Sequence, residues 1–242
     1  NVFEAWDSIK FSENSIKHLH KELLKYVEKD KLHRGKYKSK NNQVAMVDEK
    51  GKNTGILFDT THAYLTPKQM LELTEWTQKA LEDKTYHPLL VIGNFLVEYL
   101  NIHPFEDGNG RLSRVLTNLL LLKEGYLYMP YVSHEKLIED QKVAYYIALR
   151  KSQKTFKTKK ESITDWLNFF LDIILIQSQE AIGLISSENI EAILSNKQLA
   201  IWNYLQGVLE ATPKEIAEKT NIARTTVNKT ITKLLKLKKI ER

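Results

Sequence analysis

Apolar residues recur at intervals of three and four along most of the 242-residue chain. This spacing constrains the fold more than any other feature, because it places the apolar side chains on one face of an α-helix. It first occurs between Ile16 and Val27, after a helix-capping serine at Ser12 or Ser15. A capping box at Thr66–Gln69 starts the next helix. Further helices are expected over residues 89–100, from 112 to near 125, and from near 133 and 162.

One segment departs from the helical spacing. Within residues 43–61, Val44 and Met46, then Ile56 and Phe58, alternate with other residues on either side of a polar stretch at 48–51. This alternation is typical of a β-hairpin with a polar tip. The sequence therefore predicts an all-α domain that carries one small hairpin.

The composition excludes several classes of protein. Hydrophobic residues make up 42% of the chain and charged residues 27%, so wholesale disorder is excluded. Because cysteine is absent, a disulfide scaffold, a zinc–thiolate site and a cysteine nucleophile are excluded as well. The longest apolar run, around residues 119–122, is shorter than the ~18 residues that span a bilayer. We expect no membrane partner and, without a secretion signal or cysteines, a cytoplasmic location.

The net charge of +6 is concentrated at the C-terminal end. Residues 197–242 hold ten basic and four acidic side chains, which leaves the rest of the chain neutral. Such asymmetry is typical of a nucleic-acid-facing module attached to a neutral domain. A polar, serine-rich seam lies near residues 183–196. We expect one domain over residues 1–185 and a second over residues 196–242.

The second domain has the pattern of a winged helix-turn-helix. A capping box at residues 212–215 opens a short helix, a turn follows at 220–221, and a longer basic helix runs to about residue 237. Residues 238–240 begin a wing that is incomplete. The residues expected to contact DNA are Arg224, Thr225, Thr226, Asn228 and Lys229. Protein docking or dimerisation remains an alternative for this module.

Residues 103–114, with the sequence HPFEDGNGRLSR, form a loop that leads into an apolar helix. Backbone N–H groups at the start of a helix can form a nest that attracts phosphate. Arg111 and Arg114 are three residues apart on one helical face, so both can reach the same polyanion. The expected nest is formed by Gly108, Asn109 and Gly110.

The same loop contains a base and a metal ligand. Asp107 offers a hard oxygen that could hold Mg²⁺ beside phosphates. His103 has an ordinary pKa of ~6.5 and is largely neutral at pH 7, so it can accept a hydroxyl proton. Together these groups indicate nucleotidyl or phosphoryl transfer, and the absence of a Walker sequence excludes a P-loop enzyme. The remaining histidines are expected to be structural: His18, His20, His33, His62, His87 and His134.

The loop resembles the signature of Fic-domain proteins, HPFx[D/E]GNGRxxR, at every specified position. The resemblance extends from about residue 12 to residue 180 and implies a Fic helical core with a hairpin flap over about 43–61. In this family the flap aligns the target protein as an added strand. The flap residues that this implies are Phe58, Asp59, Thr60 and Thr61, for which an ordinary turn is the alternative.

The resemblance implies AMP transfer from ATP to a Ser, Thr or Tyr hydroxyl of a target protein, with release of pyrophosphate. His103 is then the general base, and Asp107 binds Mg²⁺ on the α- and β-phosphates. Phe105 anchors the loop in the core. Arg111 contacts the β-phosphate and Arg114 the γ-phosphate. The other implied ATP contacts are Asn109, the amides of Gly108 and Gly110, Tyr145 on the adenine side and Gln153.

Several alternatives remain open at this stage. Tyr145 could pack in the core, and Gln153 could be solvated. Some relatives use another nucleotide donor or remove AMP, and a DNA-binding regulator whose Fic pocket senses nucleotide is a different class of function. A sensor needs phosphate contacts but no general base, so His103 favours the enzyme. Target protein and ATP are the expected partners, DNA is an expectation for the second domain, and a homodimer is left open.

Many Fic proteins carry an inhibitory motif, (S/T)xxxE(G/N), whose glutamate pairs with the second motif arginine. The chain contains no match; the nearest stretch, residues 187–191, is followed by Ala192 where Gly or Asn is required. Because the chain also begins at Asn1 rather than methionine, we expect an upstream inhibitory segment to have been removed. Such a chain should be less inhibited than one that carries the motif.

Overall fold

A computed structural model describes residues 2–47, 53–188, 193–237 and 239–241. The predicted hairpin tip at 48–51 lies outside the described residues, as does part of the stretch nearest to the inhibitory motif. The chain divides into two compact units, Asn1–Ala181 and Ile182–Arg242. The boundary lies beside the polar seam.

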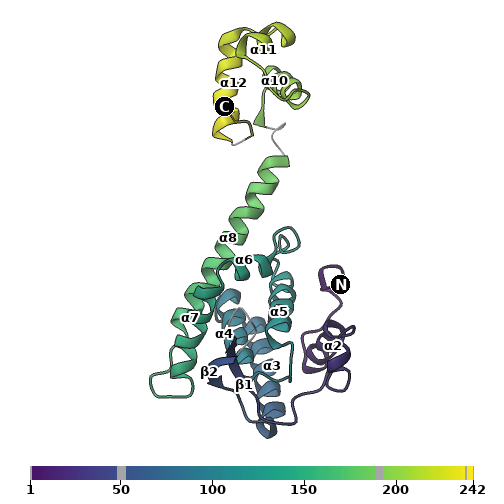
Figure 1. The fold of residues 1–242 in the computed structure, drawn as a ribbon, viewed down its shortest axis with the longest axis vertical. Helices are drawn as coiled ribbons and strands as arrows, with labels where there is room; N and C mark the ends of the chain where they lie inside the picture. The colour runs from purple at the N-terminus through teal and green to yellow at the C-terminus, as the bar shows by residue number, and fades with distance from the viewer. Residues whose placement is uncertain (1, 48–52, 189–192, 238, 242) are drawn as a thin grey trace. The chain divides into compact units, whose positions relative to one another are not determined.

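The first unit is helical, with one two-stranded sheet (Figure 1). Its elements, in chain order, are α1 (Val2–Ala5), α2 (Glu13–Leu23), the 3₁₀ turn η1 (Glu28–Asp30), β1 (Gln43–Val47), β2 (Asn53–Asp59), the 3₁₀ turn η2 (Ala63–Leu65), α3 (Thr66–Asp83), α4 (Pro88–Ile102), α5 (Asn109–Lys123), α6 (His134–Asp140), α7 (Lys142–Thr155) and most of α8 (Thr164–Glu188).

The core of this unit is centred on α4 and α5. α4 is apolar on nearly every side, as expected of a helix enclosed by others, and most of its residues are buried. α8 approaches α4 closely at Gly93, where an added Cβ would lie 2.7 Å from a Leu167 methyl carbon. At the same point Trp166 Nε1 donates a hydrogen bond of 2.7 Å to the Gly93 carbonyl. This packing fixes the position of α4, the helix that ends at the motif loop.

Three of the predicted helix caps are confirmed, and one is wrong, although α3 does begin at Thr66. Ser12, Ser133 and Thr212 each cap a helix through the side-chain oxygen. Thr66 does not cap α3, because the 3₁₀ turn η2 runs directly into that helix. The Thr66 N–H is already bonded to the His62 carbonyl, and its hydroxyl donates to the same carbonyl at 3.1 Å. No free helix end remains there for a capping box.

The two strands form an antiparallel ladder in which Gln43 pairs with Asp59 and Val47 with Asn53. Register shifts between Val44 and Ala45, and again between Met46 and Val47, interrupt the regular pairing. The two segments predicted to alternate therefore pair as strands, from residue 43 opposite residue 59, and the tip that would join them lies outside the described residues.

α8 is the one described helix that is long and apolar enough to cross a membrane by length and composition, over residues Thr164–Leu184. Core helices meet the same criterion. One face of α8 is indeed core, since it buries Trp166, Phe170, Ile173 and Ile174. Other apolar side chains of this helix, Leu175, Ile182 and Leu184, are exposed.

The described part of the second unit includes α10 (Asn196–Gln206), α11 (Pro213–Thr220) and α12 (Arg224–Lys236). α11 begins at a complete capping box of Thr212 and Glu215. The described residues after Leu237 contain no strand, so the predicted wing has no counterpart in this part of the chain. The buried core residues of the second unit include Leu194, Ile201, Ile216, Val227 and Leu234.

Candidate active site

His103 lies at the point where α4 ends and the motif loop begins. Its backbone is left-handed (φ 50°, ψ 62°), and its N–H still bonds to the Tyr99 carbonyl at 2.9 Å. Nδ1 faces the Leu100 carbonyl at 3.4 Å, so a proton on Nδ1 leaves Nε2 free to act as a base. The pKa of His103 is lowered to about 4, mainly by burial; the Leu100 carbonyl and Asp107 act to raise it, and the Lys38 ammonium acts to lower it. The imidazole is therefore neutral at pH 7.

The loop after His103 is closed by Asn109. The Asn109 side-chain oxygen accepts the Phe105 N–H at 3.0 Å, and its amide nitrogen donates to the Phe105 carbonyl at 2.7 Å. Asn109 is buried, and Phe105 is completely so. The expectation that Phe105 anchors the loop is confirmed, while the amide of Asn109 holds the loop together in this structure.

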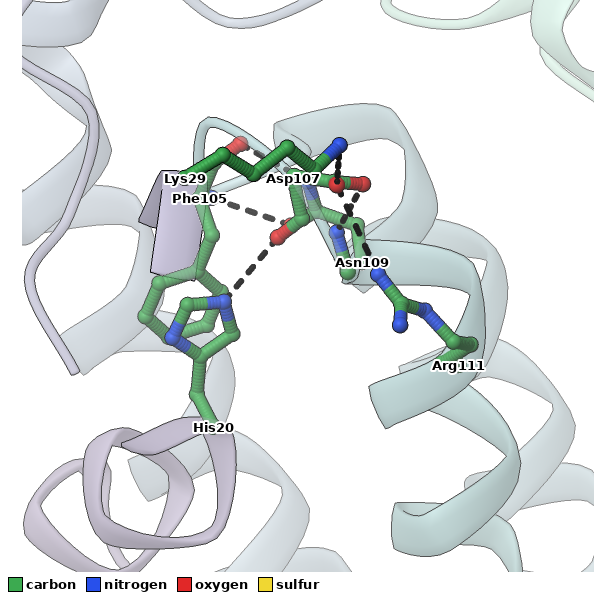
Figure 2. A network of polar contacts seen from close by, with 7 residues as sticks. His20, Lys29, Phe105, Asp107, Asn109 and Arg111 are labelled. Atoms are coloured by element: carbon green, nitrogen blue, oxygen red, sulfur yellow. Dashed lines mark hydrogen bonds and ion pairs between the residues drawn. The ribbon is translucent and has the colours of Figure 1, made fainter. Parts of the chain in front are cut away.

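His20 supports the loop from α2. Its ring stacks on Phe105 with centroids 3.8 Å apart and an interplanar angle of 6°. The Gly35 N–H donates to Nδ1 at 2.9 Å, so Nε2 must carry the proton and donates to the Asp107 backbone oxygen at 2.9 Å. Burial lowers the pKa of His20, in keeping with this neutral tautomer. Figure 2 shows the ring beneath the loop.

The Asp107 carboxylate points away from His20 and is surrounded by donors (Figure 2). Oδ1 accepts the Gly108 N–H at 2.6 Å, while Oδ2 lies 3.1 Å from Lys29 Nζ and 3.5 Å from Arg111. Burial raises the pKa of Asp107, but the Gly108 hydrogen bond and the Lys29 and Arg111 cations outweigh it, so the pKa lies below its usual value. Asp107 is therefore ionised at neutral pH.

An ionised carboxylate of this kind fits Mg²⁺, which is commonly held by one or two carboxylates together with substrate phosphates. Within the described ranges no group of three or more potential His, Cys, Asp or Glu ligands occurs. Asp107 could thus hold the ion only with oxygen atoms supplied by a bound nucleotide or by water.

The first turn of α5 presents open backbone donors. Gly108, with φ of 80°, caps the helix, and the Leu112 N–H bonds back to the Gly108 carbonyl at 2.8 Å. The preceding N–H groups, of Asn109, Gly110 and Arg111, have no acceptor within the helix and form the anion-attracting end. The Gly108 N–H is not one of them, because it is bonded to Asp107. The predicted nest is therefore displaced by one residue along the chain.

Basic side chains flank this helix end. Arg111 is exposed and adjacent to Asp107. Arg114 NH2 is 2.8 Å from Glu135 Oε1 of α6, while its Nε is buried without a hydrogen-bond partner in the described structure. Lys29 adds a third cation. The positive charge of this site can bind a polyanion. One of its arginines, Arg114, is already ion-paired with Glu135.

Tyr145 and Gln153 lie on α7. Tyr145 is buried, with its ring 5.6 Å from that of Trp166, and together with Arg114 it borders a cavity of about 20 Å³. A space of this size is much smaller than an adenine ring, so the structure places Tyr145 in the core, and its contact with a nucleotide stays a prediction. Gln153 is half-buried, and its Nε2 has no hydrogen-bond partner among the described groups.

Two of the four predicted flap residues can be placed with their side chains. The Thr60 hydroxyl bonds to the Asn42 carbonyl at 2.8 Å. The Thr61 hydroxyl donates to Gln69 at 2.7 Å, and its N–H to the Asn101 carbonyl at 3.3 Å. For Phe58 and Asp59 only the strand backbone is described. The threonines thus fasten the hairpin to the helical core.

The residues of α12 that were predicted to contact DNA differ in their exposure to solvent. Arg224, Thr225, Asn228 and Lys229 are exposed, as predicted. Thr226 is half-buried, because it lies beside the buried Val227 at the edge of the core-facing side.

The motif did not identify several groups that complete the site. Lys29, Lys38 and Glu135 carry no local sequence signal, and His20 was expected to be merely structural. Their role becomes visible only through long-range contacts, such as the hydrogen bond between His20 and Asp107, which are 87 residues apart.

Comparison with known proteins shows which family this part of the chain resembles. Residues 10–121 match the model of the Fic/DOC family, a range that includes the whole of the motif loop. This part of the chain is therefore similar to Fic domains. The chain is 28% identical over 119 residues to a probable protein adenylyltransferase of Aquifex aeolicus, which covers 48% of this chain and 36% of that protein.

Two further proteins are also similar to this chain. The protein adenylyltransferase Fic of Drosophila melanogaster is 48% identical over 42 residues, which is 17% of this chain and 8% of that protein. The crystal structure of a Fic family protein from Desulfovibrio desulfuricans has a TM-score of 0.61 at 21% identity, covering 97% of this chain and 65% of the other. The chain thus spans less than two thirds of each of these relatives, and the structural likeness supports a helical Fic fold.

Proposed function

We propose that the chain is a protein adenylyltransferase, which transfers AMP from ATP to a hydroxyl side chain of a target protein and releases pyrophosphate. The observation that carries this proposal is the pairing of a neutral base with an anion site in one loop. His103 has a free Nε2, and the open N–H groups of α5 follow six residues later beside Lys29, Arg111 and Arg114. The curated relatives named protein adenylyltransferase support the same reaction.

In this mechanism His103 Nε2 accepts the proton of the target hydroxyl. The hydroxyl oxygen forms a bond to the α-phosphorus, and the bond from that phosphorus to the bridging oxygen of the β-phosphate breaks, so that pyrophosphate leaves. Mg²⁺, when bound, would neutralise charge on the phosphates, and Asp107 is the residue that would hold it. The backbone donors of α5 stabilise the phosphate oxygens without moving, because their helix fixes them, and the Arg111 guanidinium adds positive charge beside them.

Arg114 is proposed to bind the γ-phosphate after it releases Glu135. The pair is open to solvent on the Glu135 side, whose side chain is 68% exposed, so the exchange costs little. Target binding is proposed at the hairpin, where a two-stranded sheet has open edges that an extended segment can join.

The reaction is tested by incubation of the protein and a cell extract with ATP and Mg²⁺, followed by mass spectrometry. A target peptide that gains the mass of one AMP supports the proposal. Gain of a phosphate instead, or of another nucleotide from a mixed pool in preference to AMP, contradicts it.

For the second unit we propose nucleic-acid binding through α12, a role that is separate from the transfer reaction. It is supported by the exposed basic and polar side chains of Arg224, Asn228 and Lys229 on one helix and by the net positive charge of this unit. An increase in fluorescence anisotropy of labelled duplex DNA on addition of the protein tests it.

A further inference from the structure

Lys38 places a buried ammonium beside the motif loop. It lies between η1 and β1, and only 3% of it is exposed. Its Nζ donates to the Ile102 carbonyl at 2.9 Å, to Asn42 Oδ1 at 2.7 Å and to Thr60 Oγ1 at 2.8 Å. An ammonium has three protons, so each of them has one acceptor.

The segment that contains Lys38 also holds the backbone on the other side of His103. The Lys38 N–H donates to the Pro104 carbonyl at 2.8 Å, and Asn42 Nδ2 donates to the Phe105 carbonyl at 3.0 Å. Together with the bond to Ile102, these contacts fix a carbonyl just before His103 and two just after it. The position of the imidazole thus depends on Lys38 and Asn42.

The opposite end of this network is the foot of the hairpin. Thr60 directly follows β2, and its hydroxyl is bonded to the Asn42 carbonyl as well as to Lys38. One side chain therefore joins two parts of the site that are far apart in sequence, the peptide that precedes the base and the end of the strand proposed to align the target.

Filling space does not explain an ammonium at this position. The three acceptors of the Lys38 ammonium, on Asn42, Thr60 and Ile102, are all neutral oxygens. Burial lowers its pKa to about 8. An apolar side chain of similar length would fill the same space without the cost of burying a charge.

We propose that Lys38 is a positioning residue for the transfer reaction: it fixes the backbone that carries His103 relative to the hairpin strand that presents the target. This role rests on the proposed function of His103 as the base. The positive charge of Lys38 also disfavours the imidazolium form of His103, whereas Asp107 favours it. Lys38 therefore contributes to keeping the base neutral.

The test compares Lys38→Met, Lys38→Arg and the matched control Lys40→Met, which changes an exposed lysine two residues away. The pKa of His103 is measured by NMR of histidine-labelled protein, alongside kcat and KM for ATP. We expect Lys38→Met to raise the His103 pKa above about 4, but not to its ordinary value because burial remains, and to lower kcat on the order of 10- to 100-fold with little change in KM. Lys38→Arg should recover part of both, and Lys40→Met should change neither.

A folded Lys38→Met protein with unchanged His103 pKa and unchanged kcat would overturn the proposal. If Lys38→Met does not fold, Thr60→Val removes the acceptor of Lys38 at the end of β2, together with the bond from the Thr60 hydroxyl to the Asn42 carbonyl. It should speed amide hydrogen exchange in β1 and β2 while the His103 pKa stays low, and unchanged exchange would also overturn the proposal. If no variant transfers AMP, the proposed function fails, but the pKa and exchange measurements still decide the role of Lys38.

Discussion

His20 Nε2 lies 2.9 Å from the backbone oxygen of Asp107, so a histidine of the second helix holds the carbonyl of the candidate metal ligand. The other ring nitrogen accepts the Gly35 N–H, which fixes the tautomer. With its ring stacked on Phe105, His20 supports the motif loop through both its edge and its face.

Replacement of His20 should therefore weaken both the fold and the site. His20→Ala removes two hydrogen bonds and a buried stacked ring, and we expect a loss of about 2–4 kcal/mol in the free energy of unfolding. ATP binding should weaken because the loop that carries Asp107 is no longer supported. Urea denaturation and calorimetric titration measure the two effects. His18→Ala, on the exposed side of the same helix, is the control and should change neither.

Buried neutral histidines predict how stability depends on pH. Burial lowers the pKa of His103 and of His134 to about 4 from an ordinary value of 6.5. As the pH falls, the unfolded chain binds these protons first, so stability is complete above about pH 6.5 and declines between 6.5 and 4. Each group should contribute on the order of 1–3 kcal/mol to this decline.

Chemical denaturation at pH 7, 6, 5 and 4.5 measures that decline. His134→Gln should reduce its slope, while replacement of the exposed His18 should leave it unchanged. A free energy of unfolding that is constant across this range, or that increases towards low pH, would contradict the assignment of neutral buried rings.

Glu135 is predicted to compete with nucleotide for Arg114. Glu135→Gln removes the negative charge that lies 2.8 Å from the guanidinium, so ATP should bind more tightly. Exposed ion pairs contribute ~0.2–1 kcal/mol, which limits the gain to about 5-fold in Kd. Glu139→Gln, on the same helix but paired with Lys142, is the matched control. Equal affinities for ATP in the Glu135 and Glu139 variants would show that Arg114 is not limited by this contact.

The exposed face of α12 predicts salt-dependent binding to DNA. Arg224→Ala and Lys229→Ala should each weaken binding and lower the slope of log affinity against log salt by about 0.9 for each phosphate that is no longer neutralised. Anisotropy titrations between low and physiological salt provide the slope. Lys214→Ala on α11 serves as the control for a general decrease in positive charge. A slope that is the same in all variants would indicate that α12 is only a solvated face.

The helices and the motif loop could be predicted because their signals are local. Apolar spacing placed α4 and α5 on either side of the loop, and Ser12 capped its helix as expected. The predicted cap at Thr66 was wrong because the preceding 3₁₀ turn, which has no strong sequence signature, supplied the hydrogen bonds that a helix start normally lacks. Local patterns describe an element well only where its ends are free.

The supporting groups of the site could not be predicted in the same way. Lys38 contacts Ile102 across 64 residues, and His20 contacts Asp107 across 87. Each looks like an ordinary residue of a polar or helical segment until the chain is folded. Tyr145 shows the converse, since a position with an expected ligand role is packed against Trp166 in the core.

The most direct test of the central claim is label transfer from α-³²P-ATP and, in parallel, γ-³²P-ATP, with Mg²⁺ and a cell extract. Wild-type protein, His103→Ala and the control His18→Ala are compared. We predict label on the protein itself or on an extract protein from the α-labelled nucleotide only, retained in His18→Ala and abolished in His103→Ala. Label from the γ-position, or equal α-label with His103→Ala, would contradict AMP transfer by this base.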